Sequence, residues 1–389
     1  MGYVGWLGTF QGQKGTGKEK NFESEMVKEL VELGAVLYVK TSVPYTLMSG
    51  ETINNIIEYT YNPTNRNLSS GGSSGGEGAL IALKGSPVGF GTDIGGSIRI
   101  PSAFNGLYGL RPSTGRLPYE GMANSFDGAP TVLSVVGPLS GTPGGLKLVA
   151  QSILSKEPWL HDPLVHPIPW RSEPEESVKQ LAQEKKLAFA VFRHDGMCEV
   201  HPPVKRAIEE VVKKLESQGH KIIEWKPPSH KNLASICFKA WGYDGGADAR
   251  KAFDLSGEDV HSTILMVESS QANATEIMEN QVAKRSAEKE YMEYWNSTKD
   301  LTGTGRPVDA IISPLAPFAA ARPGKYSYYN YSTWVNVLDY TSVVVPVTKV
   351  DKNVDKAYSD FKPVDETDKI TQESCKSNRP IQTSGLLHC

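Results

Sequence analysis

Two short clusters of glycine and serine constrain the fold of this 389-residue chain more than any other feature. The first is GGSSGG at residues 71–76, and the second is GTDIGGSIR at residues 91–99. The segment between them, EGALIALK at residues 77–84, predicts one short helix, and a short strand is expected at 88–90. Such a unit brings both clusters to one end, where backbone amides and serine hydroxyls can form a site.

With 389 residues, 39% of them apolar, the chain could form one large α/β domain or two medium ones, and we expect one, over residues 1–350. After about Asp351 the periodicity is lost, and residues 351–389 are expected to be an irregular, disordered tail. The expected helices are 22–33, 204–217 and most of 232–299. The expected strands are 35–39, 187–192, 221–225, 308–313 and 343–347, the second and third forming a parallel βαβ unit and the last lying near a sheet edge because of Pro346.

Charge and cysteine usage narrow the class of partner. Lys and Arg total 41 and Asp and Glu 44, a net charge of −3 with no run of one sign, so no nucleic-acid partner is expected. No apolar run reaches the roughly 18 residues that span a bilayer, and we see no signal peptide, so no membrane is expected. The widely spaced cysteines suit a reducing compartment without disulfides. We expect a cytoplasmic protein that acts on a small molecule, and a homodimer remains open.

A phosphate-binding loop is the weakest reading of the glycines. GQKGTGK at residues 12–18 is a near match, but Glu19 stands where the motif needs Ser or Thr, and the helix begins only near Phe22. We therefore interpret this stretch as a solvated loop.

A nucleophile elbow around Ser74 is a second alternative, because GSSGG formally fits G-x-S-x-G. An elbow needs a strand leading directly into it, whereas residues 62–67 form a polar loop. It also needs a downstream histidine, and the eight histidines lie mostly in proline-rich or charged segments that predict surface positions.

Both clusters together, with their surroundings, closely resemble the amidase signature. GGSSGGEGALIALKGSPVGFGTDIGGSIRIPSAFNGLYGLRPSTGR matches it over about 45 positions, and the likeness extends through GAVLYVKTSVP, NRNLSSGG and PYEGMANSFDGAPTVLSVVGPLS. The chain is most similar to the fungal acetamidase and general-amidase branch. The resemblance implies the amidase-signature fold, a single domain with a mixed, largely parallel sheet flanked by helices on both faces, and a signature core at 65–140. It also implies hydrolysis of a carboxamide to a carboxylate and ammonia or an amine, without metal or cofactor.

The resemblance assigns roles to individual residues. It implies Ser97 as nucleophile and Ser73, in a cis peptide, as the hydroxyl that relays its proton to a lysine. A serine hydroxyl needs such a base, and burial can suppress the charge of an amine. The backbone amides of Ile94, Gly95, Gly96 and Ser97 can form an oxyanion hole. Supporting roles fall to Ser74, Asp93 and Arg99, and Leu47, Met48 and Ser49 lie where related enzymes line the acyl pocket, although ordinary loop packing explains these last three nearly as well.

The catalytic lysine of the family lies ahead of the stretch that residues 1–6 resemble. None of the candidates in this sequence matches its position: Lys14, Lys18, Lys20, Lys28, Lys40 and Lys84. We therefore expect an amidase truncated at both ends, with little or no activity as written. The alternative is a non-catalytic relic or pseudoenzyme. An amidotransferase subunit shares the signature, but no added tRNA-binding segment supports it.

Overall fold

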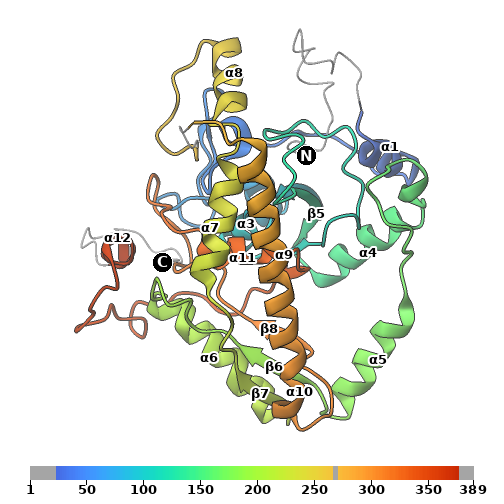
Figure 1. Cartoon of the computed structure of the whole chain (residues 1–389), viewed down its shortest axis with the longest axis vertical. Helices are drawn as coiled ribbons and strands as arrows, with labels where there is room; N and C mark the ends of the chain where they lie inside the picture. Colours follow the sequence, from blue (N-terminus) through green and yellow to red (C-terminus); the bar gives the residue numbers. More distant parts are fainter. Residues whose placement is uncertain (1–22, 266–269, 376–389) are drawn as a thin grey trace.

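The protein, described here from a computed structural model over residues 23–265 and 270–375, divides its strands among three sheets (Figure 1). One is antiparallel with the order β3-β5-β4-β9, one is parallel with the order β7-β6-β8, and one pairs β1 with β2. The strands are β1 Ile53–Asn54, β2 Glu58–Tyr59, β3 Val88–Asp93, β4 Tyr108–Arg111, β5 Val135–Ser140, β6 Ala188–Val191, β7 Lys221–Glu224, β8 Ala310–Ile312 and β9 Ser342–Val344.

Helices surround these sheets, and their ends follow capping signals in the sequence. The longest described helix, α9, begins with a capping box in which Asn273 Oδ1 accepts from Glu276 N at 3.1 Å and Glu276 Oε2 accepts from Asn273 N at 2.8 Å. The α-helices are α1 Glu25–Glu32, α2 Gly75–Ala82, α3 Arg99–Phe104, α4 Pro143–Leu154, α5 Ser172–Gln183, α6 Pro202–Ser217, α7 His230–Trp241, α8 Ala247–Ser256, α9 Ala274–Ser297, α10 Lys299–Thr302, α11 Asn330–Val337 and α12 Glu366–Cys375. Short 3₁₀ turns are η1 Tyr45–Leu47 and η2 Pro158–Leu160.

The predicted βαβ unit is present. Strand β6 pairs in parallel with β7, with Ala188 opposite Lys221, and α6 connects the two strands. The helix starts at Pro202, where proline's fixed φ is compatible with the first turn. This unit and β8 form the lower part of the molecule in Figure 1, away from the glycine–serine clusters.

The antiparallel sheet carries the second cluster. Strand β3 pairs with β5 from Val88 opposite Ser140 to Asp93 opposite Val135, and most of β3 is buried. Strand β9 lies at the edge of this sheet, as Pro346 predicted. The expected α/β class with mixed strand pairing is confirmed, with the difference that parallel pairing is confined to β7-β6-β8.

The largest buried cluster joins β6, α7, α9 and α11. Its aromatic members pack face to edge, for example Trp334 with Phe192 at 6.2 Å and Trp225 with Trp295 at 5.5 Å between ring centroids. In Figure 1, α7 and α9 run side by side along the molecule with α11 behind them. This core fixes α11, which contacts the second glycine–serine cluster directly.

One secondary-structure prediction and one burial prediction were wrong. Residues 35–39 were expected to form a buried strand, but they belong to none of the three sheets, and the side chain of Val36 is 84% exposed. An apolar run becomes a buried strand only when a neighbouring strand pairs with it, and no described strand lies there. The histidines were expected at the surface, but His201 and His230 are buried.

The predicted disordered tail is also corrected in part. Residues 366–375 form α12, whose polar side chains Asp368, Thr371 and Gln372 are buried against residues 199–201. Hydrogen bonds rather than an apolar stripe hold this helix, so periodicity could not predict it. Residues 376–389 and the loop at 12–18 lie outside the described residues. No helix in the described ranges is long and apolar enough to cross a membrane.

Candidate active site

The second cluster forms the turn between β3 and α3, and Ser97 lies in it. Asp93 ends the strand and its carboxylate organises the turn by accepting from Gly96 N at 2.9 Å and from Ile98 N at 3.2 Å. Gly96 has φ +129°, a conformation that favours glycine. The turn therefore takes its shape from Asp93 and from the glycine that precedes Ser97.

A buried ion pair supports this turn. Arg99 donates through Nε to Asp93 Oδ2 and through Nη2 to Asp93 Oδ1, both at 3.0 Å, and both side chains are essentially inaccessible. Burial alone would raise the pKa of Asp93, but the Arg99 guanidinium, with Arg111 and Asn336, holds that pKa below its ordinary value. Asp93 is therefore ionised, and its role is structural, as the sequence predicted.

Helix α11 completes the support, which the sequence analysis missed. Asn336 Nδ2 donates to Asp93 Oδ1 at 2.8 Å, and Asn336 Oδ1 accepts from Arg99 Nη2 at 2.6 Å. Ser332 Oγ donates to Gly95 O at 2.5 Å, while Ser332 O accepts from Arg99 Nη1 at 2.9 Å. These residues lie more than 230 positions from the turn, and no local signal links them to it.

The first cluster lies against the second. The peptide between Gly72 and Ser73 is cis, as the resemblance implied, and Ser74 N donates to Ser97 O at 3.2 Å. A Cβ on Gly91 would lie 2.2 Å from Ser74 Oγ, so only glycine allows this approach. The expectation that both clusters meet at one end of the α2–β3 unit is confirmed.

Glu77 of α2 locks this arrangement. Its Oε1 accepts from Phe90 N on β3 at 3.1 Å, and its Oε2 accepts from Thr41 Oγ1 at 2.6 Å. The segment after Thr41 leads to Leu47, Met48 and Ser49, so one buried carboxylate joins three parts of the site. Its position inside EGALIALK gave no sign of this role.

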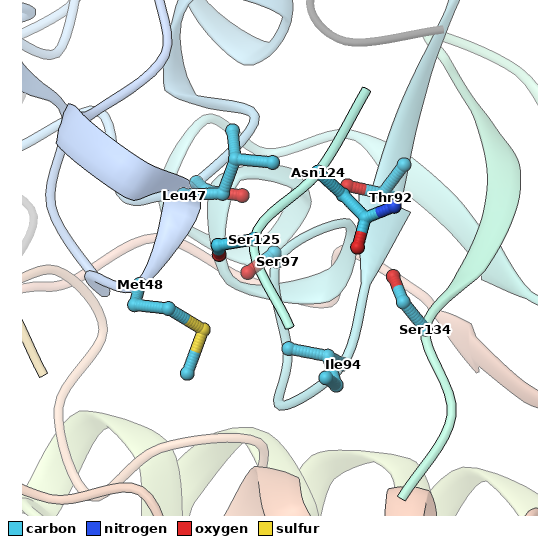
Figure 2. Close-up of a pocket in the computed structure, with 9 residues that line it drawn as sticks. Leu47, Met48, Thr92, Ile94, Ser97, Asn124, Ser125 and Ser134 are labelled. Atoms are coloured by element: carbon cyan, nitrogen blue, oxygen red, sulfur yellow. The ribbon is translucent and has the colours of Figure 1, made fainter. Parts of the chain in front are cut away.

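A pocket lies beside Ser97 and is lined by residues from both clusters. Figure 2 shows Thr92, Asn124 and Ser134 with their polar ends near one another, Leu47 and Met48 on the opposite side, and Ile94 below them. The lining residues are Leu47, Met48, Ser73, Thr92, Ile94, Ser97, Asn124, Ser125 and Ser134, and an adjoining hollow adds Ser49, Gly95, Ile100, Trp241, Leu265 and Tyr329.

Most of the predicted site residues are thus gathered at one place. Ser73 and Ser97 share the pocket, Leu47 and Met48 line it, and Ser49 lines the adjoining hollow, although the role of these last three toward substrate stays a prediction. Asn124, Ser125 and Ser134 were missed, and the only available signal was their position within the resembling segment after Arg116.

Among the described residues that line the pocket and the adjoining hollow there is neither a histidine nor a lysine. Burial lowers the pKa of Lys40 to about 7. Burial likewise lowers the pKa of His201 and of His230 to about 4. In the described ranges, no group of three or more His, Cys, Asp or Glu side chains is arranged to hold a metal ion.

The fold and this paired serine site match those of known proteins. The model of the amidase family matches residues 13–380, and the chain belongs to that family. It is 45% identical over 372 residues to an acetamidase of Aspergillus oryzae, an alignment that covers 95% of this chain and 66% of the relative. It is 43% identical to an acetamidase of Emericella nidulans, covering 96% of this chain and 67% of the relative. The chain thus spans about two thirds of the length of these relatives.

Comparison with solved structures supports the same family. A fatty acid amide hydrolase superposes with a TM-score of 0.84 and 32% identity, covering 95% of this chain and 63% of that one. A bacterial aryl acylamidase of the amidase signature family superposes with a TM-score of 0.68 at 21% identity, covering 86% of this chain and 70% of that one. At this identity, the likeness shows the shared fold alone. The chain therefore has the amidase-signature fold.

Proposed function

We propose that this site hydrolyses a carboxamide to a carboxylate and ammonia or an amine through an acyl-enzyme on Ser97. The observation that carries the proposal is that Ser73 and Ser97 line one pocket, with Ser74 N bonded to Ser97 O at 3.2 Å. The two acetamidase relatives suggest small carboxamides as substrates.

In this mechanism, Ser97 Oγ attacks the amide carbonyl while its proton passes to the Ser73 hydroxyl and on to a base. The tetrahedral intermediate carries an oxyanion that backbone amides stabilise. Gly96 N already donates to Asp93 Oδ1. Because the Gly96 N–H is already engaged, we propose that the oxyanion hole consists of the backbone amides of Ile94, Gly95 and Ser97 only.

The proposed base is a lysine that accepts the proton from the Ser73 hydroxyl. The resemblance implies a lysine, no lysine here matches its position, and none is among the described residues that line the pocket. Members of a triad act as a unit, so the 389-residue chain should turn over amides at least about a thousandfold more slowly than a chain that has the lysine.

The test compares this chain with a chimaera that has the N-terminal segment of the Aspergillus oryzae acetamidase joined ahead of Met1. Both are assayed for ammonia release from acetamide and benzamide. We expect turnover by the chimaera that a Ser97→Ala change abolishes. Comparable turnover by the 389-residue chain contradicts the proposed need for the lysine, and no turnover by a folded chimaera favours a non-catalytic relic.

We also propose that the protein works in the cytoplasm. The free, buried thiols of Cys198 and Cys237 support a reducing compartment. A homodimer stays a prediction that size-exclusion chromatography with light scattering would test.

A further inference from the structure

Trp241, the last residue of α7, lies directly over the turn that carries Ser97. A Cβ built on Gly95 would be 2.6 Å from both Cζ2 and Cη2 of the indole. Any side chain at position 95 would therefore collide with the ring. The glycine of the turn and the tryptophan of α7 form a closely fitted pair, although they are 146 positions apart in the sequence.

The neighbours of Trp241 hold its ring in place. Phe238 packs edge-on at 5.4 Å between centroids, and Tyr329 does so at 6.4 Å. The hydroxyl of Tyr329 in turn accepts from Gly50 N at 2.9 Å, which fixes that ring too. Trp241 is only 4% exposed, so it forms a rigid wall rather than a movable flap.

The indole of Trp241 lines the apolar side of the pocket at Ser97. Trp241, Leu265 and Met48 line the hollow beside Ser97, and Leu265 N donates to Met48 O at 2.7 Å, which joins the two sides of the hollow. Polar groups lie on the other side of the pocket, at Thr92, Asn124 and Ser134 (Figure 2). An amide bound at Ser97 would therefore direct its acyl chain toward Trp241 and its nitrogen toward the polar side.

The room on the apolar side is small. The hollow holds about 20 Å³ of open space, which accommodates about one water-sized group. A single methyl group fits such a space, and we expect a longer acyl chain to meet the indole that lines it. The indole N–H of Trp241 has no hydrogen-bond acceptor in the described part of the chain, so no protein contact beyond packing depends on it.

We propose that Trp241 is the specificity-determining residue that closes the acyl side of the pocket and restricts the site to short-chain carboxamides. This inference rests on the proposed function, because it requires an amide bound at Ser97. It predicts that shortening the side chain opens a channel for longer acyl groups. Each added methylene buried there should then strengthen binding about fourfold.

The test measures binding, so it does not depend on turnover. Dissociation constants for acetamide, butanamide and hexanamide are measured by ligand-observed NMR on the 389-residue chain and on its Trp241→Ala and Leu265→Ala variants. We expect the unmodified chain to bind acetamide at least as well as hexanamide. The variants should reverse this order, with hexanamide gaining about tenfold or more over acetamide.

Trp334→Phe is the matched control. Trp334 is an equally buried tryptophan whose ring N–H also lacks an acceptor among the described residues, and it does not line the hollow. Its substitution should leave the order of the amides unchanged. An unchanged order in both folded pocket variants overturns the role of Trp241 while the amide site stands. Failure of the unmodified chain to bind any of the three amides overturns the inference and the proposed substrate class together.

Discussion

Asp93 and Asp368 are both completely buried carboxylates, but the protein satisfies them in different ways. Asp93, in the turn before Ser97, is paired with the Arg99 guanidinium and with the amide of Asn336. Asp368, in α12, accepts hydrogen bonds from the neutral backbone amides of Glu199 at 3.1 Å and Val364 at 2.9 Å. The first carboxylate is paired with a cation, and the second is held by backbone amides.

The two kinds of hydrogen-bond partner predict different tolerance to substitution in the Ser97 turn and in α12. An ion pair in the interior leaves an uncompensated charge when one partner is removed. When a carboxylate held only by backbone amides is replaced, no unpaired charge stays behind. The substitution leaves only neutral N–H donors without an acceptor. The turn at Ser97 should therefore be the less tolerant of the two regions, although both are equally buried.

The largest effect is expected from Arg99→Met. It leaves Asp93 ionised without its cation and should lower the free energy of unfolding by about 3–5 kcal/mol. Urea unfolding followed by circular dichroism measures the change. The double variant Asp93→Asn with Arg99→Met should cost less than the sum of the single changes. A loss below about 1 kcal/mol for Arg99→Met would show that the ion pair does not support the turn.

The second-largest loss of stability is expected on lowering the pH, because His201 is buried beside α12. Its Nε2 lies 2.9 Å from Thr371 O, and burial lowers its pKa from an ordinary 6.5 to about 4. The folded state therefore resists protonation, so stability is complete above pH 6.5 and is lost as pH falls toward 4. The loss should be on the order of 3 kcal/mol.

The difference between the wild type and His201→Gln isolates this effect. Glu29, whose pKa burial raises to about 7, changes stability in the opposite direction over part of this range. His230 shares the direction of His201, and both residues are present in each protein. Parallel pH–stability curves for the two proteins would contradict the assignment to His201.

A smaller effect is expected from Asp368→Ala. The amides of Glu199 and Val364 lose an acceptor, which should cost about 1–3 kcal/mol. The loss should appear first as faster proteolysis within residues 351–375, because α12 is held by few apolar contacts. Lys369→Ala, at an exposed position on the same helix, is the control and should change neither quantity. If Asp368→Ala lowered the free energy of unfolding as much as Arg99→Met does, the proposed contrast between the two carboxylates would be wrong.

The sequence predicted much of the site because its parts are local. Ser73, Ser97, Asp93 and Arg99 lie within 27 positions of one another, and glycine marks each place where backbones approach closely. Ser332, Asn336 and Trp241 escaped notice because their contacts with the turn arise only from the packing of α7 and α11. Helix α12 escaped notice for another reason, since hydrogen bonds rather than apolar periodicity hold it. The strand expected at 35–39 shows the reverse error, an apolar run with no described strand beside it.

The central claim, that Ser97 is the nucleophile, is tested most directly by covalent labelling. The chimaera with the acetamidase N-terminal segment is incubated with a fluorophosphonate, and the adduct is located by intact mass and peptide mapping. We predict one adduct on Ser97, absent from Ser97→Ala and retained in Ser74→Ala, whose hydroxyl lies against Gly91. An adduct that persists in Ser97→Ala, or that maps to another serine, would contradict the account.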